Sequence, residues 1–238
     1  MTGRDEIDHA YSLAEGFVDT GRYDEAARLI AGLLTKDRDP DLPRLRDLLS
    51  AVVDASDNAG ARVNLALVLM HEDADATPEE VSIAVTLLQE AADLAEDPSS
   101  GQGSRTVAAL AHGLLGDCFV AGRGTEADAG TAVLHYRRAA EQGNGKAALN
   151  VALALDGGVL DQPVDKDEAA HFYRIAVEAG EPRAMTNLAL LYMSDLEPPD
   201  EVTVVDLLER ARDLGDDNAA EVLDQLYRDT IGEEPAED

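Results

Sequence analysis

The chain has 238 residues, of which 45% are hydrophobic and only 4% aromatic, with no tryptophan. Its formal net charge of −30 excludes the basic surface that proteins need to bind nucleic acid or anionic membranes. A single cysteine excludes an intrachain disulfide framework, and the sequence has neither the pattern of a signal peptide nor an apolar run long enough to span a bilayer. We therefore expect a cytoplasmic protein that binds neither nucleic acid nor membranes.

The acidity of the chain has two interpretations. Acidic residues are spread widely, while lysine occurs only at Lys36, Lys146 and Lys166, a bias that favours adaptation to a salty cytoplasm or simple solubility. The alternative is recognition of a basic partner, including mimicry of nucleic acid. The charge is also uneven, because residues 105–180 are close to neutral whereas both flanks are acidic. An anionic ligand would meet the least repulsion in that middle segment.

The first 35 residues have the apolar spacing of two amphipathic helices. The residues at helical intervals on either side of Gly21 are Leu13, Phe17, Tyr23, Ala26 and Ile30. Two prolines, Pro40 and Pro43, then mark a break in the helical pattern. A further helical pair follows at 61–95, where Thr77 and Glu80 are spaced as a capping box that starts its second helix. Residues 97–104 are predicted to be a linker or long loop.

From residue 105 onward, one pattern recurs about every 36 residues. It consists of an alanine, a leucine or valine four positions later, and a large apolar residue eight positions after the alanine. The copies begin at Ala111, Ala147, Ala184 and Ala219, with a more diverged copy at Ala61. Offsets of four and eight place these side chains on one face of a helix. Each copy therefore predicts the first helix of a repeat.

A second pattern in each copy predicts a partner helix. It runs from an aromatic residue or leucine, through an alanine three positions later, to a residue that ends the helix after seven. We expect Tyr136 and Tyr173 to be buried between repeats. The glycines predicted to end these helices in a left-handed conformation are Gly143, Gly180 and Gly215. The aspartates predicted to cap their starts are Asp128, Asp165 and Asp200.

Residues 105–231 resemble tandem Sel-1-like repeats, a helical-repeat family related to tetratricopeptide repeats, most closely from Gly122 through Tyr136 to Gly143. Residues 1–35 are similar to a tetratricopeptide repeat instead. The resemblance implies an all-α fold, a right-handed α-solenoid of αα-hairpin repeats with a concave face. The implied division is into tetratricopeptide-like repeats at 1–96, a linker or long loop at 97–104, Sel-1-like repeats at 105–231 and an acidic disordered tail at 232–238.

No pattern in the sequence indicates an enzyme, a metal site or a cofactor site. Residues 71–75 lack the ligand spacing of a zinc site or an EF-hand loop. Cys118 with His112 or His135 has the residue types of a thiol nucleophile and its base. However, Cys118 falls on the apolar face of a repeat helix, where we expect a buried and inert thiol. Residues 122–124 lack the context of a phosphate loop and are interpreted as a turn between helices.

Polar side chains recur on the first helices of the repeats. An asparagine precedes the repeat leucine or valine in three copies, and in two of them a cation stands four positions earlier, on the same helix face. Apolar residues follow on that face. The predicted ligand-binding set is Asn64, Lys146, Asn150, Leu153, Arg183, Asn187, Leu190 and Met193. The resemblance implies that such residues line the concave face and hold a peptide backbone or a carboxylate. Alternatively, the asparagines tie neighbouring repeats together.

The sequence thus predicts a non-catalytic adaptor or scaffold that binds a protein or peptide in its concave face. We expect an acidic side chain or a C-terminal group of the partner to lie between Lys146 and Arg183. The resemblance also suggests a second function, a cognate inhibitor such as an immunity protein that neutralises a toxin. An enzyme is the third alternative, and it would need a cleft with titratable groups of shifted pKa. Nothing in the sequence indicates an oligomeric state.

Overall fold

The computed structural model describes residues 3–36, 40–71, 76–99, 104–194 and 204–231, and all regular structure there is helical. The helices in these ranges are α1 (Gly3–Asp19), α2 (Tyr23–Lys36), α3 (Leu42–Ala55), α4 (Ala59–Leu69), α5 (Pro78–Glu96), α6 (Arg105–Ala121), α7 (Ala129–Glu141), α8 (Gly145–Gly157), α9 (Lys166–Glu178), α10 (Pro182–Ser194), α11 (Val204–Asp213) and α12 (Asp217–Ile231). None of them is long and apolar enough to cross a membrane. The predicted all-α fold class is confirmed.

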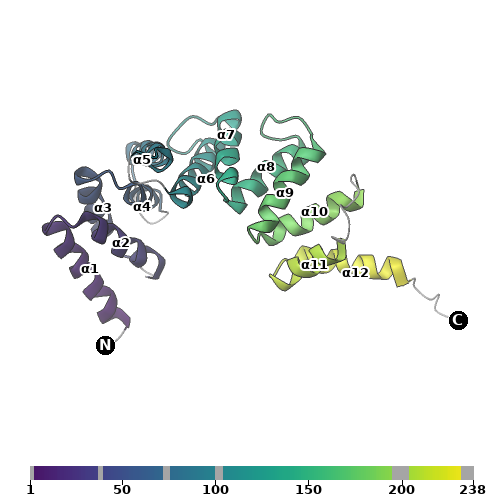
Figure 1. Ribbon diagram of the computed structural model, residues 1–238, viewed down its shortest axis with the longest axis horizontal. Coiled ribbons are helices and arrows are strands. Elements are labelled where there is room, and N and C mark those ends of the chain that lie inside the picture. Colours follow the sequence, from purple (N-terminus) through teal and green to yellow (C-terminus); the bar gives the residue numbers. More distant parts are fainter. Residues whose placement is uncertain (1–2, 37–39, 72–75, 100–103, 195–203, 232–238) are drawn as a thin grey trace. The chain divides into compact units, whose positions relative to one another are not determined.

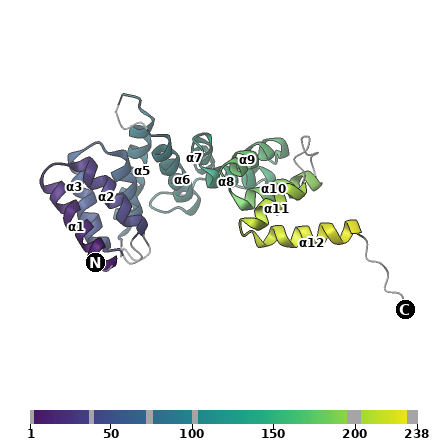
Figure 2. The same ribbon diagram turned by 60° about the horizontal axis from the view of Figure 1, so that its bottom comes forward.

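The chain forms two compact units, residues 1–135 and residues 136–238, whose boundary falls within α7. Inside each unit, consecutive helices pack against each other as hairpins, for example α4 with α5 and α8 with α9 (Figures 1 and 2). The first helices of the repeats are α4, α6, α8 and α10, and the second helices are α5, α7, α9 and α11. The predicted division at 97–104 concerns the type of repeat and stays a prediction, while the tail at 232–238 lies outside the described residues.

Local capping explains where several helices begin. The Thr77 hydroxyl accepts a hydrogen bond from the backbone N–H of Glu80 at 3.2 Å, and the Glu80 carboxylate accepts one from the backbone N–H of Thr77 at 2.8 Å. This reciprocal pair is the predicted capping box. Asp128 and Asp165 each accept a hydrogen bond from the backbone N–H three residues later, at 2.9 Å. These predicted caps are confirmed, and Asp200 lies outside the described residues.

Glycines in the left-handed region follow the second helices. The backbone φ angle is +97° at Gly143, +87° at Gly180 and +90° at Gly215, which confirms the predicted conformation. A side chain with a Cβ atom is strained in this region, whereas glycine adopts it at little cost. The second helices α7, α9 and α11 therefore end within a few residues of the next helix, which fixes the length of these repeats.

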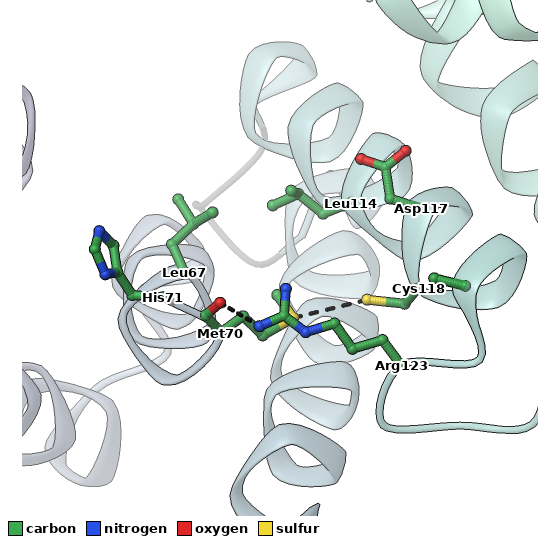
Figure 3. A pocket seen from close by; sticks show the side chains of 8 residues that line it. Leu67, Met70, His71, Leu114, Asp117, Cys118 and Arg123 are labelled. Carbon is green, nitrogen blue, oxygen red and sulfur yellow. Dashed lines mark hydrogen bonds between the residues drawn. The ribbon is translucent and has the colours of Figure 1, made fainter. Parts of the chain in front are cut away.

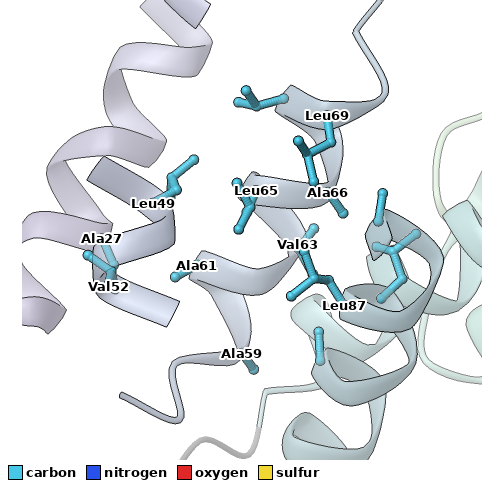
Figure 4. Packing of buried hydrophobic residues seen from close by; sticks show 14 of the residues in the cluster. Ala27, Leu49, Val52, Ala59, Ala61, Val63, Leu65, Ala66, Leu69 and Leu87 are labelled. Carbon is cyan, nitrogen blue, oxygen red and sulfur yellow. The ribbon is translucent and has the colours of Figure 1, made fainter. Parts of the chain in front are cut away.

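Small and branched apolar side chains from neighbouring helices build the core of unit 1 (Figure 4). Ala27 of α2 and Leu49 and Val52 of α3 belong to the same buried cluster as Leu65 of α4 and Leu87 of α5. Alanines allow helix backbones to approach closely, and leucines fill the remaining space at the density of a protein interior. Each fully buried leucine contributes about 1.5–3 kcal/mol to the free energy of folding, so this cluster fixes how α2 to α5 pack.

Two tyrosine rings anchor the packing of unit 2. Tyr136 is 3% exposed and Tyr173 is fully buried, which confirms that both rings lie in the interior. The second helices are also joined by a charge pair, because Arg137 of α7 contacts the carboxylate of Glu168 on α9 at 2.5 Å. The same guanidinium lies 5.1 Å from the ring centre of Phe172. Arg137 therefore links α7, the C-terminal part of which belongs to this unit, to α9.

Candidate binding surfaces on the first helices

Unit 2 displays most of the predicted ligand-binding residues on α8 and α10. We call these residues the α8–α10 surface: Lys146, Asn150, Leu153, Arg183, Asn187, Leu190 and Met193. The two cations are exposed, and the two asparagines and Leu153 are half-buried. Leu190 is 36% exposed and Met193 is 48% exposed. Spacings of three and four along each helix place them on one face. The eighth predicted residue, Asn64, is half-buried on α4 in unit 1 and is not part of this surface.

The buried hydroxyl of Tyr173, which belongs to α9, contacts both helices that carry this surface, α8 and α10. It donates a hydrogen bond to Asp156 Oδ2 at the end of α8, at 3.0 Å, while Lys166 Nζ pairs with the other carboxylate oxygen at 2.5 Å. Burial raises the pKa of Tyr173 well above its ordinary value, and the charge of Asp156 and the hydrogen bond to it act in the same direction. A hydrogen bond from the Asn187 side chain and the positive charge of Arg183 oppose this rise in pKa. The end of α8 and the first turns of α10 therefore meet at one phenol.

The two halves of the α8–α10 surface differ in what they already bind. Within the described residues, the side chains of Lys146 and Asn150 make no hydrogen bond or ion pair, although both reach solvent. The amide of Asn187 is engaged by Tyr173, as the alternative role of tying helices together requires. Arg183 is exposed and influences Tyr173 only through its charge. The α8 half thus offers an ammonium and an amide to a ligand, and the α10 half offers a guanidinium.

Unit 1 has a hollow of about 460 Å³ on its own first helices (Figure 3). The lining residues are Leu67, Met70, His71, Leu114, Asp117, Cys118, Ala121 and Arg123. The first three come from α4, its C-cap and the residue after the C-cap, and the others come from α6 and the turn that follows it. In repeat register, Leu67 matches Leu153 and Leu190, and Leu114 matches Asn150 and Asn187. The hollow therefore occupies the helix face that carries the polar residues in unit 2.

Two sulfur atoms form one wall of the hollow. Cys118 Sγ lies 3.7 Å from Met70 Sδ, and the Arg123 guanidinium donates a hydrogen bond to the backbone carbonyl of Met70 (Figure 3). Cys118 is 4% exposed, and burial raises the pKa of its thiol, as does the nearby charge of Asp117. A neutral thiol is a poor nucleophile. The prediction of a buried cysteine is confirmed.

The two histidines considered as a base for Cys118 bind each other instead. His112 Nδ1 lies 3.0 Å from His135 Nδ1, and His112 Nε2 lies 3.0 Å from a carboxylate oxygen of Glu96. The ring of His135 stacks on Phe119 with a centroid distance of 5.5 Å. Among the residues that the structure describes, no group of three or more histidine, cysteine or acidic side chains is placed to hold a metal ion. This cluster joins α5, α6 and α7 in unit 1.

Sequence reasoning predicts the residues of the α8–α10 surface but gives neither the hollow nor the link through Tyr173. The predicted set depends on asparagine at one register position, which includes Asn64 and leaves out Leu114, the residue at that position in α6. The sequence feature that could have indicated the hollow is Leu114 itself, an apolar residue where the other first helices have asparagine. The link through Tyr173 needs Asp156 at the end of α8, and no repeat pattern marked that aspartate.

Comparisons with known proteins bear on the repeats. The sequence pattern of the Sel1 repeat matches residues 59–95, 109–144, 145–181 and 182–216, which together make up more than half of the chain. A Sel1 repeat protein from Oxalobacter formigenes has a similar structure, with a TM-score of 0.67 and 20% identity over 95% of this chain and 94% of that chain. A putative Sel1 repeat protein from Klebsiella pneumoniae gives a TM-score of 0.43 at 21% identity, over 80% of this chain and 96% of that one. No curated protein matches the chain significantly.

Proposed function

Because the chain belongs to the Sel1 repeat family, whose members are generally non-catalytic scaffolds for protein interaction, we propose that it is an adaptor for a protein or peptide. The partner binds across the α8–α10 surface. It places a carboxylate, from an acidic side chain or a C-terminus, between Lys146 and Arg183. Leu153, Leu190 and Met193 bury apolar side chains of the same segment.

The observation that carries this proposal is the unpaired state of Lys146 and Asn150. In an acidic chain a lysine has many possible partners, yet among the described residues this one makes no ion pair. An ammonium beside an unbonded amide suits a carboxylate and its neighbouring peptide group. Charge-assisted hydrogen bonds of this kind contribute about 1.5–3 kcal/mol each. The α8 half of the surface is therefore the better anchor.

The electrostatics of the α10 half support the same ligand. The charge of Asp156 is already matched by Lys166 and by the Tyr173 hydroxyl. Within the described residues, Arg183 makes no ion pair with a carboxylate. Lys146 stands in the least acidic part of the sequence, which lowers the repulsion that an acidic ligand meets there, whereas Arg183 lies at the start of the acidic C-terminal flank.

The test is a titration of a labelled peptide of alternating leucine and glutamate, with a free C-terminal carboxylate, into the protein and its double variant. Lys146→Ala with Arg183→Ala should weaken binding at least tenfold, about 1.4 kcal/mol. The melting temperature should not change, because both side chains are exposed and unpaired within the described structure. The matched control is Arg138→Ala with Arg174→Ala, which removes the same charge from exposed positions on the second helices α7 and α9.

Equal affinity of the double variant and the unaltered protein would leave Lys146 and Arg183 as ordinary solvated surface. An equal loss in the control would mean that net charge alone attracts the peptide. The methyl resonance of Met193, which is 48% exposed at the edge of the surface, should shift during the titration. No described feature of the chain favours the toxin-inhibitor alternative over the adaptor.

A further inference from the structure

The hollow in unit 1 has the size and lining of a ligand site. Its volume of about 460 Å³ lies within the range of pockets that hold ligands, and it exceeds what one large side chain fills. Leu67 and Leu114 line it from different helices, together with Met70 (Figure 3). Ala121 adds to this apolar lining. Methionine is flexible and polarisable, so it adapts to apolar ligands of different shape.

The repeat register shows that α6 departs from the other first helices toward apolar residues. Leu114 stands where α4, α8 and α10 have asparagine, and Leu110 stands where α8 and α10 have a cation. Leu110 is 42% exposed, so this exchange does not serve the core. Apolar side chains exposed next to a hollow indicate a surface that another molecule covers.

The lining of the hollow holds one anion and one cation, and the net charge of unit 1 favours a basic ligand. Asp117 is exposed at its rim, at the register position where Leu67, Leu153 and Leu190 stand in the other first helices. The guanidinium of Arg123 is held by the carbonyl of Met70. Residues 1–135 contain 25 acidic and 10 basic side chains, so the unit as a whole attracts cations.

We propose that this hollow binds a basic amphipathic helix of a partner protein. Two apolar side chains spaced by three or four residues enter between Leu67 and Leu114, and a lysine or arginine of the same helix lies beside Asp117. A helix presents apolar anchors at this spacing and basic residues along their edge. The site goes beyond the adaptor function proposed above, because it lies on unit 1 and selects the opposite charge from the α8–α10 surface.

The methionines allow one experiment to observe both sites. Of the four methionines in the chain, Met70 lines the hollow and Met193 lies on the α8–α10 surface. A model helix of leucine and lysine, with leucines three and four residues apart, is titrated into protein labelled at the methionine methyl groups. The variants Met70→Leu and Met193→Leu assign the two resonances. We expect the Met70 resonance to shift and the Met193 resonance to stay, whereas the leucine–glutamate peptide should give the reverse.

Two variants test whether the shift reports binding in the hollow. Leu114→Asn introduces the residue that other repeats carry at this position, and Leu67→Asn alters the opposite wall from α4. Each should weaken binding of the leucine–lysine peptide about tenfold, because a buried leucine contact is lost. The control is Leu134→Asn, which changes a 52% exposed leucine of α7 that does not line the hollow and should leave the affinity unchanged.

Several results would overturn the proposal. One is a Met70 resonance that does not shift at peptide concentrations up to about 1 mM, which would mean that the dissociation constant is weaker than about 1 mM. Another is equal affinity for a peptide in which serine replaces leucine, or glutamine replaces lysine, since the first removes the anchors and the second removes the charge. A Met70 resonance that moves with protein concentration alone would assign the hollow to a second copy of this chain. Because the adaptor proposal is tested by Met193 and Lys146, either proposal can fail alone.

Discussion

Replacing Tyr173 by phenylalanine isolates the hydroxyl that connects α8, α9 and α10. The ring is fully buried and remains in the variant, so no cavity forms. What is lost is the hydrogen bond to Asp156 Oδ2 at 3.0 Å and the oxygen that the Asn187 side chain binds. The change therefore tests how much these polar contacts contribute beyond the packing of the ring.

The expected loss in the free energy of unfolding depends on how well Asp156 is solvated and paired once the hydroxyl is gone. A hydrogen bond to a charged group contributes about 1.5–3 kcal/mol. Asp156 is partly exposed, with 27% of its side chain accessible, and keeps its pair with Lys166, so water replaces part of the lost contact. We expect a loss of about 1.5 kcal/mol in the free energy of unfolding. Tyr173→Ala removes the ring as well and should cost about 3–5 kcal/mol.

The measurement is urea denaturation of four proteins: the unaltered chain, Tyr173→Phe, Asp156→Asn and the double variant. If the hydroxyl and the carboxylate act through each other, the double variant should lose less than the two single losses added together, by about 1 kcal/mol. Additive losses would refute the contact between Tyr173 and Asp156 as a source of stability. A loss below about 0.5 kcal/mol in Tyr173→Phe, which is typical of a surface substitution, would refute the conclusion that the Tyr173 hydroxyl stabilises the packing of α8, α9 and α10.

Two further predictions concern a glycine turn and alkaline pH. Gly124→Ala should lower the free energy of unfolding by about 2–4 kcal/mol, because the φ of +72° disfavours a side chain and the added Cβ atom would lie 2.5 Å from the carbonyl oxygen of Val81. In the control Gly143→Ala only the backbone strain applies, because no atom lies within 4 Å of the added Cβ. Thermal melts should therefore show the larger loss of stability in Gly124→Ala. Stability should fall above about pH 10, where tyrosine ionises in the unfolded chain, because the raised pKa of Tyr173 keeps its proton bound in the folded state. The fall approaches about 1.4 kcal/mol per pH unit for this residue, and denaturation at rising pH should show a shallower decline in Tyr173→Phe.

Most of the fold could be predicted because the same residue spacing recurs in successive repeats. Tyr136 and Tyr173 follow one pattern, and both are buried. Gly143, Gly180 and Gly215 follow another, and all three have positive φ angles. One such pattern alone would be weak support for a helix boundary, but the same spacing in successive copies restricts the register to one solution.

Contacts outside the repeat pattern could not be predicted in the same way. Arg62 is 9% exposed and its guanidinium binds the carbonyl of Ser56 and the carboxylate of Glu90, which joins α4 to α5 and to the residue after α3. A sequence pattern that expects apolar residues at buried positions gives no reason to bury this arginine. The same holds for the pairing of His112 with His135, because the distance between two side chains on different helices depends on how those helices pack.

The first helices show how one fold provides surfaces of different chemistry. The positions that face the core hold an alanine and, four residues later, a leucine or valine in every copy, since close packing between hairpins allows little else. The positions on the open face are free of that constraint, so one register position holds Asn150 and Asn187 in unit 2 and Leu114 in unit 1. A substitution on this face alters what binds there without altering the repeat. Differences between copies, more than their common pattern, therefore predict where this chain would contact a partner.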